Sequence, residues 1–364
     1  MPDKKILILY ATAGAGHKKA AEALGHGLKE RYPGARLADI IDYIPSINAK
    51  LYNDGYSFLI KHFPGLWGFI YFLSDTPYLS LVNVVFRKFF NRLMCGRFIK
   101  MLMDERPDQI ISTHFLTSEI VSYCKKELGL GSLLTTVITD FGVHNFWIEE
   151  GTDIYCCASE STKDILLSKG MEGKKIKVTG VPLDEKFLKI QDKRSICTEL
   201  GLESGVFTSL IITGGIGAGP IEEIVDDIRE MSQVLVVCGN NKRLYDRLVS
   251  KNYKNVKVFG FIDFVEKLMT VSDIVITKAG GLTITESLAK EDPMIFFFLI
   301  PGQESINALT ICSGGAGLIA TKQNDIKRAV LGFKSDPEML KCFREKAKEL
   351  SRPDSVKSIV SLLG

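Results

Sequence analysis

The sequence lacks the marks of several large protein classes. Its eight cysteines show no C-x-x-C spacing, and most lie in apolar runs where a reduced thiol packs as a small hydrophobe, so we expect no zinc site. No run reaches the about 18 uninterrupted apolar residues of a transmembrane helix, and the apolar stretch 6–10 is too short for a signal peptide. We therefore expect a cytoplasmic protein whose membrane contact is peripheral.

A concentrated basic stripe is also missing. The formal net charge is only +3, which argues against a dedicated nucleic-acid-binding protein but leaves contact with an anionic membrane open. The composition, with 46% hydrophobic and 24% charged residues, is that of an ordinary globular protein. A length of 364 residues predicts two domains.

Short apolar strands alternate with helices along most of the chain. The first half predicts strands at 4–10, 109–112, 133–139, 154–158 and 176–179, with helices at 17–32, 117–128 and 162–168. The second half predicts strands at 209–213, 234–238, 256–259, 274–277 and 294–299. The expected fold class is α/β, with Rossmann-like domains at 1–183 and 184–364 and a final helix that can pack back on the first domain.

The stretch from about 43 to 103 interrupts this alternation. It has no clear strand and is rich in aromatic residues, including Trp67, Tyr71 and Phe72. Its second part adds Arg87, Lys88, Arg92 and Arg97, as a helix does when it lies at a membrane surface. Two interpretations remain open: a membrane-binding helical insertion, or a helical insertion whose aromatic residues form core.

Small residues at 11–16 predict a sharp turn at the carboxyl end of the first strand. Gly16 ends this turn and His17 follows it, so His17 is expected at a helix N-terminus, at the sheet edge where α/β folds bind ligands. The turn lacks the third glycine of a dinucleotide fingerprint, and no ribose-binding acid follows cleanly, although Asp39 and Asp42 are near. A capping role for His17 is the alternative.

The second half contains three polar corners after strands. They predict a site for a sugar nucleotide, which we call the donor site. The glycines at 214–219 are expected to bind a diphosphate through backbone N–H groups, and Glu286 can bind a ribose diol. Adjacent Gln303 and Glu304 suit the vicinal hydroxyls of a sugar. The complete predicted donor set is Gly214, Gly215, Gly217, Phe261, Ile262, Lys278, Gly280, Gly281, Thr283, Glu286, Gln303, Glu304 and Asn307.

Taken together, these motifs resemble the monogalactosyldiacylglycerol synthases and processive diacylglycerol glucosyltransferases, and more distantly the peptidoglycan GlcNAc transferase. The resemblance covers nearly the whole chain, and the most telling motifs are Lys278 to Glu286 and Pro301 to Asn307. It implies a GT-B fold with two facing domains and a cleft, a UDP-sugar in the C-terminal domain and a lipid acceptor at the N-terminal domain. Ala15 and Ala279 depart from the family pattern without removing a functional group.

In families of this kind the transfer inverts the anomeric centre, which requires a base. His17 is our first candidate, and Asp140 is either the base itself or the residue that orients it, with a turn or capping role as the alternative. Gly16, His114 and His144 are expected to line the acceptor site. No D-x-D follows a strand, so backbone N–H groups are expected to meet the diphosphate charge, with no essential metal ion or cofactor.

Three other functions compete as explanations of the same residues. A nicotinamide-dependent oxidoreductase is disfavoured because neither glycine corner completes G-x-G-x-x-G. A transferase acting on a polyprenyl-linked or soluble acceptor remains an alternative. A non-catalytic sugar-nucleotide sensor also remains, although a sensor does not need a base.

Overall fold

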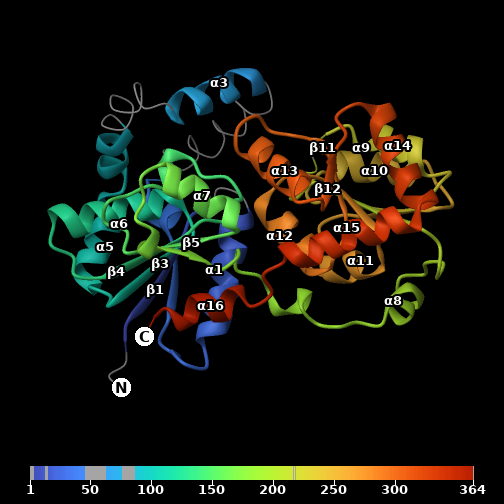
Figure 1. Cartoon of the computed structure of the whole chain (residues 1–364). Coiled ribbons are helices and arrows are strands. Elements are labelled where there is room, and N and C mark those ends of the chain that lie inside the picture. Colours follow the sequence, from blue (N-terminus) through green and yellow to red (C-terminus); the bar gives the residue numbers. More distant parts are fainter. Residues whose placement is uncertain are drawn as a thin grey trace. The chain divides into compact units, whose positions relative to one another are not determined.

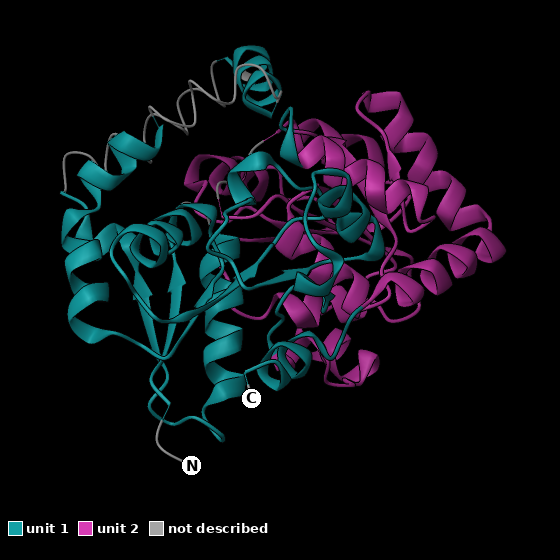
Figure 2. Ribbon diagram, turned by 60° about the vertical axis from the view of Figure 1, so that its left-hand side comes forward, with its two compact units in different colours: residues 1–184, 300–303, 352–364 teal, residues 185–299, 304–351 magenta. Residues whose placement is uncertain are grey.

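The structure, a computed structural model, describes residues 4–12, 15–45, 63–75, 87–215, 217 and 219–363. The chain divides into two compact units, which Figure 2 colours separately. The first contains residues 1–184, 300–303 and 352–364, and the second contains residues 185–299 and 304–351. The cleft between two facing domains stays a prediction.

The first unit is built on six parallel strands in the order β2-β1-β3-β4-β5-β6 (Figure 1). Their bounds are β1 Ile6–Tyr10, β2 Arg36–Asp39, β3 Gln109–Ser112, β4 Leu133–Val137, β5 Ile154–Cys157 and β6 Ile176–Val178. The helices are α1 Ala15–Leu28, α3 Pro64–Asp75, α5 Gly96–Glu105, α6 Phe115–Glu127, α7 Glu160–Ser168 and α16 Ser355–Ser361, with 3-10 turns η1 Ile40–Tyr43, η2 Asn145–Trp147 and η3 Gly173–Lys175. Residues 87–94 are also largely helical.

Strand β1 explains why helices cover both faces of this sheet. Ile6 and Ile8 pack in one cluster with apolar residues of α1 and α16. Leu7 and Leu9 pack in another cluster with residues of α5 and α6. Because successive strand residues point to opposite faces, an uninterrupted apolar run needs cover on both sides. The last helix thus belongs to the core of the first unit.

The second unit has its own parallel sheet, in the order β12-β11-β10-β7-β8-β9. The strands are β7 Thr208–Ile212, β8 Gln233–Val237, β9 Val256–Phe259, β10 Ile274–Lys278, β11 Met294–Phe298 and β12 Gly317–Ile319. The helices are α8 Lys193–Glu199, α9 Ile221–Ile228, α10 Lys242–Ser250, α11 Val265–Val271, α12 Gly281–Ala289, α13 Gln303–Ser313, α14 Gln323–Ser335 and α15 Pro337–Leu350, and η4 is Glu185–Phe187. One continuous core packs α9, α10 and α14 on this sheet.

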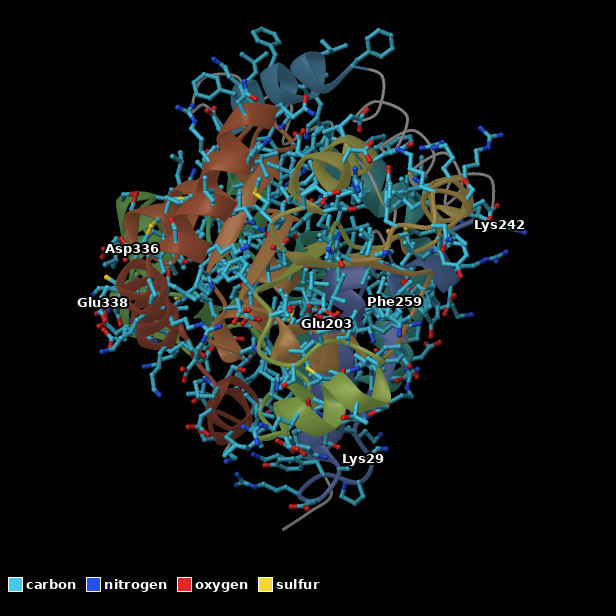
Figure 3. The ribbon with its side chains drawn as sticks, turned by 90° about the vertical axis from the view of Figure 1, so that its right-hand side faces the viewer. Lys29, Glu203, Lys242, Phe259, Asp336 and Glu338 are labelled. Atoms are coloured by element: carbon cyan, nitrogen blue, oxygen red, sulfur yellow. The ribbon has the colours of Figure 1, made fainter. Side chains whose placement is uncertain are left out.

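Helix α15 shows how local sequence sets an element boundary in this unit. The Asp336 carboxylate accepts a hydrogen bond from the Met339 backbone N–H at 3.0 Å, and a proline follows at the first helical position. Asp336 and Glu338 lie together where the helix begins (Figure 3). Both carboxylates suit a helix N-terminus, where the backbone N–H groups favour negative charge.

The doubly wound α/β fold class predicted from sequence is confirmed, and most strands agree to within two residues. Two strands were missed, β2 and β12. Both are short and lie at sheet edges, where little apolar alternation is needed. The helix expected at 17–32 is α1, which begins earlier and ends at Leu28. Within the described residues, no helix combines the length and apolarity needed to span a membrane.

Both strand orders create a position where polar residues can gather. In the first sheet the chain leaves β1 toward β2 and returns beside β1 as β3. In the second it leaves β7 toward β8 and β9, and returns beside β7 as β10. Ligands of open α/β sheets bind beyond the carboxyl ends of such neighbouring strands.

Candidate active site

His17 lies at the switch point of the first sheet, on the first turn of α1. Its Nδ1 is 2.7 Å from the Thr113 carbonyl oxygen, which follows β3, and 3.0 Å from the Thr139 hydroxyl, which follows β4. The Thr113 hydroxyl in turn donates to the His17 carbonyl oxygen at 3.0 Å. The loops after β3 and β4 thus fix the orientation of this imidazole.

These contacts assign the imidazole tautomer. A carbonyl oxygen only accepts hydrogen bonds, so Nδ1 carries the proton and the lone pair lies on Nε2. Burial lowers the pKa of His17 below its usual value, opposed by the Asp140 carboxylate and the Thr113 carbonyl. The ring is therefore neutral near pH 7, as a general base must be.

Asp140 lies in the loop after β4 and is 4% exposed. Its carboxylate accepts a hydrogen bond from the Gln303 side-chain amide, in the segment 300–303 that belongs to the first unit. Gln303 therefore contacts the candidate catalytic carboxylate, a role that the sequence did not predict for it. A direct contact between Gln303 and a donor sugar stays a prediction.

The other two predicted histidines are buried and act as helix caps. His114 is 2% exposed, and its Nδ1 accepts from the Leu116 backbone N–H at 3.1 Å at the start of α6. His144 is 3% exposed and accepts from Phe146 in the same way before η2. Burial lowers the pKa of His114 well below its usual value, and the His17 ring, 4.5 Å away between centroids, adds to this. The described contacts give both rings structural roles.

Helix α3 is attached to the first unit through its carboxyl end. The Asp75 carboxylate accepts from the Asn145 backbone N–H at 2.8 Å and from Lys169 Nζ at 2.9 and 3.0 Å. His144 Nε2 lies 3.1 Å from the Tyr71 carbonyl oxygen, and the two rings are 4.4 Å apart. We call Asp75, Asn145 and Lys169 the α3 clamp.

Two of the basic residues predicted to meet a membrane instead pair with buried carboxylates. Arg87 Nη2 lies 3.0 Å from Glu119, and Lys88 Nζ lies 2.7 Å from Glu149. Both acids are nearly inaccessible, so they need these cations. This pairing argues against a surface role for Arg87 and Lys88.

The remaining two basic residues differ from each other. Arg92 stacks over the Tyr123 ring, with its guanidinium carbon 4.0 Å from the ring centroid. Arg97 is exposed on α5 and stays a candidate for contact with an anionic surface. The aromatic residues predicted before 63 and between 76 and 86 lie outside the described part of the chain.

In the second unit, the glycine corner after β7 packs against the loop after β8. Gly214 and Gly217 have positive φ angles of 73° and 59°. A Cβ at Gly217 would lie 2.3 Å from the Cys238 carbonyl oxygen, and one at Gly239 would lie 2.7 Å from that of Gly215. These glycines allow two backbone loops to touch. Gly239 was not among the predicted site residues. It lies in the sequence C-G-N-N, which indicates a turn.

The N-terminus of α12 suits a diphosphate better than that of α9. Helix α12 begins at Gly281, is preceded by Gly280 and has no acidic residue in its first turn. Helix α9 carries Glu222 and Glu223 there, and like charges repel a phosphate. Thr283 and Glu286 lie on the first two turns of α12 and are partly exposed. The α12 N-terminus at 280–283 is therefore a second candidate for the diphosphate, and the predicted contact at 214–219 stays a prediction.

The first turns of α13 face the loop after β10. The Glu304 carboxylate lies 2.6 Å from Lys278 Nζ. Asn307 is fully buried and donates to the Ala279 carbonyl oxygen at 3.0 Å, so its described contact fixes the loop. Phe261 and Ile262 lie in the loop after β9, and Phe261 is 71% exposed. Neither residue takes part in these two contacts.

Asp39 also has a role that the sequence did not reveal. Its carboxylate accepts from the Thr12 backbone N–H at 3.2 Å, from the Thr12 hydroxyl and from the Ile41 backbone N–H at 2.9 Å. It holds the loop after β1 and caps η1. Asp39 is one of the two acids near the expected ribose-binding position, and its carboxylate is engaged by Thr12 and by the Ile41 backbone N–H.

Two Rossmann-like sheets, each with polar residues gathered at its switch point, define the GT-B fold class. Solved structures agree. MurG from Acinetobacter baumannii is 13% identical, with 99% of both chains covered and a TM-score of 0.64. A UDP-GlcNAc 2-epimerase from Neisseria meningitidis is 16% identical, with 99% of both chains covered and a TM-score of 0.63. At these identities only the fold is shared, and one fold supports several chemistries.

Sequence relatives identify the family. The family described as monogalactosyldiacylglycerol (MGDG) synthase matches residues 17–183, and the glycosyltransferase family 28 C-terminal domain matches residues 210–349. Monogalactosyldiacylglycerol synthase 3 of Arabidopsis thaliana is 32% identical, covering 98% of this chain and 80% of the relative. A processive diacylglycerol beta-glucosyltransferase of Staphylococcus epidermidis is 29% identical, with 95% and 89% covered. The chain belongs to this family of glycosyltransferases.

Proposed function

We propose that the protein transfers a hexose from a UDP-sugar to the free hydroxyl of diacylglycerol at a membrane surface. The substrates named for its relatives, monogalactosyldiacylglycerol synthases and a diacylglycerol glucosyltransferase, support this choice. The observation that carries the proposal is the His17 ring, which is neutral and has its Nε2 lone pair available to take a proton.

The reaction needs one base and one leaving group. Nε2 of His17 removes the proton from the acceptor hydroxyl as its oxygen attacks the anomeric carbon. The bond between that carbon and the diphosphate oxygen breaks, and its electron pair leaves with UDP. Attack on the face opposite the leaving group inverts the anomeric centre. Asp140 supports this step electrostatically, because its negative charge favours the imidazolium that forms.

On the donor side, the residues of the second unit have distinct tasks. The N-terminus of α12 stabilises the charge that develops on the diphosphate, without a metal ion. Glu286 binds the ribose hydroxyls, and Glu304 binds hydroxyls of the hexose. Transfer requires the bound hexose and the acceptor hydroxyl to meet beside His17.

Peripheral membrane binding is the second part of the proposal. Helix α3, the residue before it and residues 87–94 expose a set of large apolar side chains: Phe63, Leu66, Phe69, Ile70, Phe72, Phe89, Phe90 and Leu93. We call these residues the apolar patch. Phe72 is 70% and Leu93 72% exposed, which favours insertion into a headgroup layer over core packing. The Tyr71 ring, by contrast, lies against the His144 ring, tilted by 51°.

The test combines purified protein, vesicles containing diacylglycerol, and UDP-glucose or UDP-galactose in turn. We expect one or both donors to yield a glycosylated diacylglycerol detected by mass spectrometry, and His17→Ala to yield almost none. Transfer only to a polyprenyl phosphate or a soluble sugar would reject the proposed acceptor. Donor binding without transfer to any acceptor would favour a sensor.

A further inference from the structure

Lys278 and Glu304 form an ion pair that neither sequence motif predicts. Lys278 is the last residue of β10, where the register with β11 shifts between Thr277 and Lys278. Such a bulge changes the direction in which a side chain points. Lys278 Nζ lies 2.6 Å from a carboxylate oxygen of Glu304, which is 6% exposed on the first turn of α13.

A second bond joins the same two elements one helical turn further on. Asn307, three residues after Glu304, donates to the carbonyl oxygen of Ala279, the residue after Lys278. Both Asn307 and Ala279 are fully buried. Residues three apart lie on one helix face, so a single face of α13 is bonded to two consecutive residues of the loop.

We infer that Lys278 is a positioning residue for Glu304, one that holds this carboxylate in the orientation that meets the hexose hydroxyls. The inference rests on the proposed function. A carboxylate has two oxygens and about four lone-pair sites, so a bond from lysine is compatible with further bonds from sugar hydroxyls. If Lys278 turned to the diphosphate instead, a nearly buried carboxylate would lose its cation, which is costly.

Lys278 can either position Glu304 or bind the diphosphate, and these two roles predict different ligand affinities. UDP has no hexose, so a residue that acts through Glu304 affects UDP-hexose binding and spares UDP. For Lys278→Met we expect a UDP dissociation constant within about twofold of wild type, the usual limit of indirect effects. We expect UDP-hexose binding to weaken about tenfold or more, the share of one charge-assisted hydrogen bond.

A double-mutant cycle makes the test sharper. Glu304→Gln should weaken UDP-hexose binding similarly. The double variant should lose no more UDP-hexose affinity than either single variant, because both changes break the same ion pair. Lys278→Arg should restore part of the loss. The matched control is Lys267→Met, which breaks a lysine–glutamate pair of the same 2.6 Å length between α11 and α8 and should change neither affinity.

Isothermal titration calorimetry with UDP, UDP-glucose and UDP-galactose measures the dissociation constant of each variant, and thermal unfolding checks that the variant is folded. Equal losses of UDP and UDP-hexose in Lys278→Met, or additive losses in the double variant, would place Lys278 on the diphosphate and overturn the inference. A wild-type protein that binds none of these ligands would instead overturn the proposed function, so the two failures are distinct.

Discussion

His17 is held by one ring nitrogen and can react through the other, which makes a clear prediction for turnover. His17→Ala should lower kcat by about two to four orders of magnitude, the usual share of a general base, while the UDP dissociation constant stays nearly unchanged. Saturating-donor kinetics and calorimetry measure the two quantities. If His17→Ala retained most activity while Asp140→Ala abolished it, Asp140 would be the base.

The pH dependence tests how Asp140 acts on His17. Burial lowers the pKa of His17 below 6.5, so the neutral base persists at pH 7 and activity should fall only as the pH drops further. The Asp140 carboxylate raises this pKa, so Asp140→Asn should move the acidic limb of kcat to lower pH. A rate profile between pH 4.5 and 8 checks the direction of the shift. An unmoved limb would show that Asp140 does not act on His17 through its charge.

Glu286 is the residue on α12 that we expect to bind ribose. Glu286→Ala should weaken both UDP and UDP-hexose binding by roughly 1.5–3 kcal/mol, the worth of hydrogen bonds to a charged group. The equal loss distinguishes Glu286 from Glu304. Calorimetry with both ligands is the measurement, and an unchanged UDP affinity in a folded variant would remove Glu286 from the donor site.

At the scale of the elements, the α3 clamp attaches α3 to the loop that carries Asp140. Helix α3 is also a helix with exposed aromatic residues. Asp75 accepts from a backbone N–H and from Lys169 at the end of α3. Asp75→Ala should therefore raise the apparent KM for diacylglycerol in vesicles severalfold, because α3 loses its attachment. The UDP affinity should not change. Asp164→Ala, an exposed aspartate on α7, is the matched control. Equal effects of both variants on KM would reject a special role for the clamp.

The elements also show where sequence reasoning succeeds and where it stops. Strands such as β8 and β10 were predicted to within one residue because buried parallel strands are continuous apolar runs. The pairings of Lys278 with Glu304 and of Arg87 with Glu119 were not, because they join residues 26 and 32 positions apart (304 − 278 and 119 − 87). No local pattern encodes such a contact. The basic residues at 87–97 predicted a single surface. In the structure, Arg87 and Lys88 pair with buried carboxylates, whereas Arg97 is exposed.

At the scale of the whole molecule, the proposed reaction joins a water-soluble donor to an acceptor that cannot leave the bilayer cheaply. Each methylene moved into water costs about 0.8 kcal/mol, so the enzyme must work at the membrane. The proposal assigns the base to the switch point of one unit and the donor-binding groups to the switch point of the other. The apolar patch is the described feature that fits the remaining task of finding the membrane.

The final prediction concerns this patch. Changing Phe69, Phe72 and Leu93 to serine removes side chains that are 61%, 70% and 72% exposed, so little core is lost and the melting temperature should stay close to that of wild type. Sedimentation with diacylglycerol vesicles and transfer to them should fall sharply, whereas UDP binding should persist. Leu331→Ser, on a 50% exposed site of α14, is the control for loss of an exposed apolar residue. Arg87→Met should instead lower the melting temperature, because it leaves Glu119 buried without its cation. Vesicle binding that survives the triple serine change would mean that another surface docks the protein, with exposed Arg97 the next residue to change.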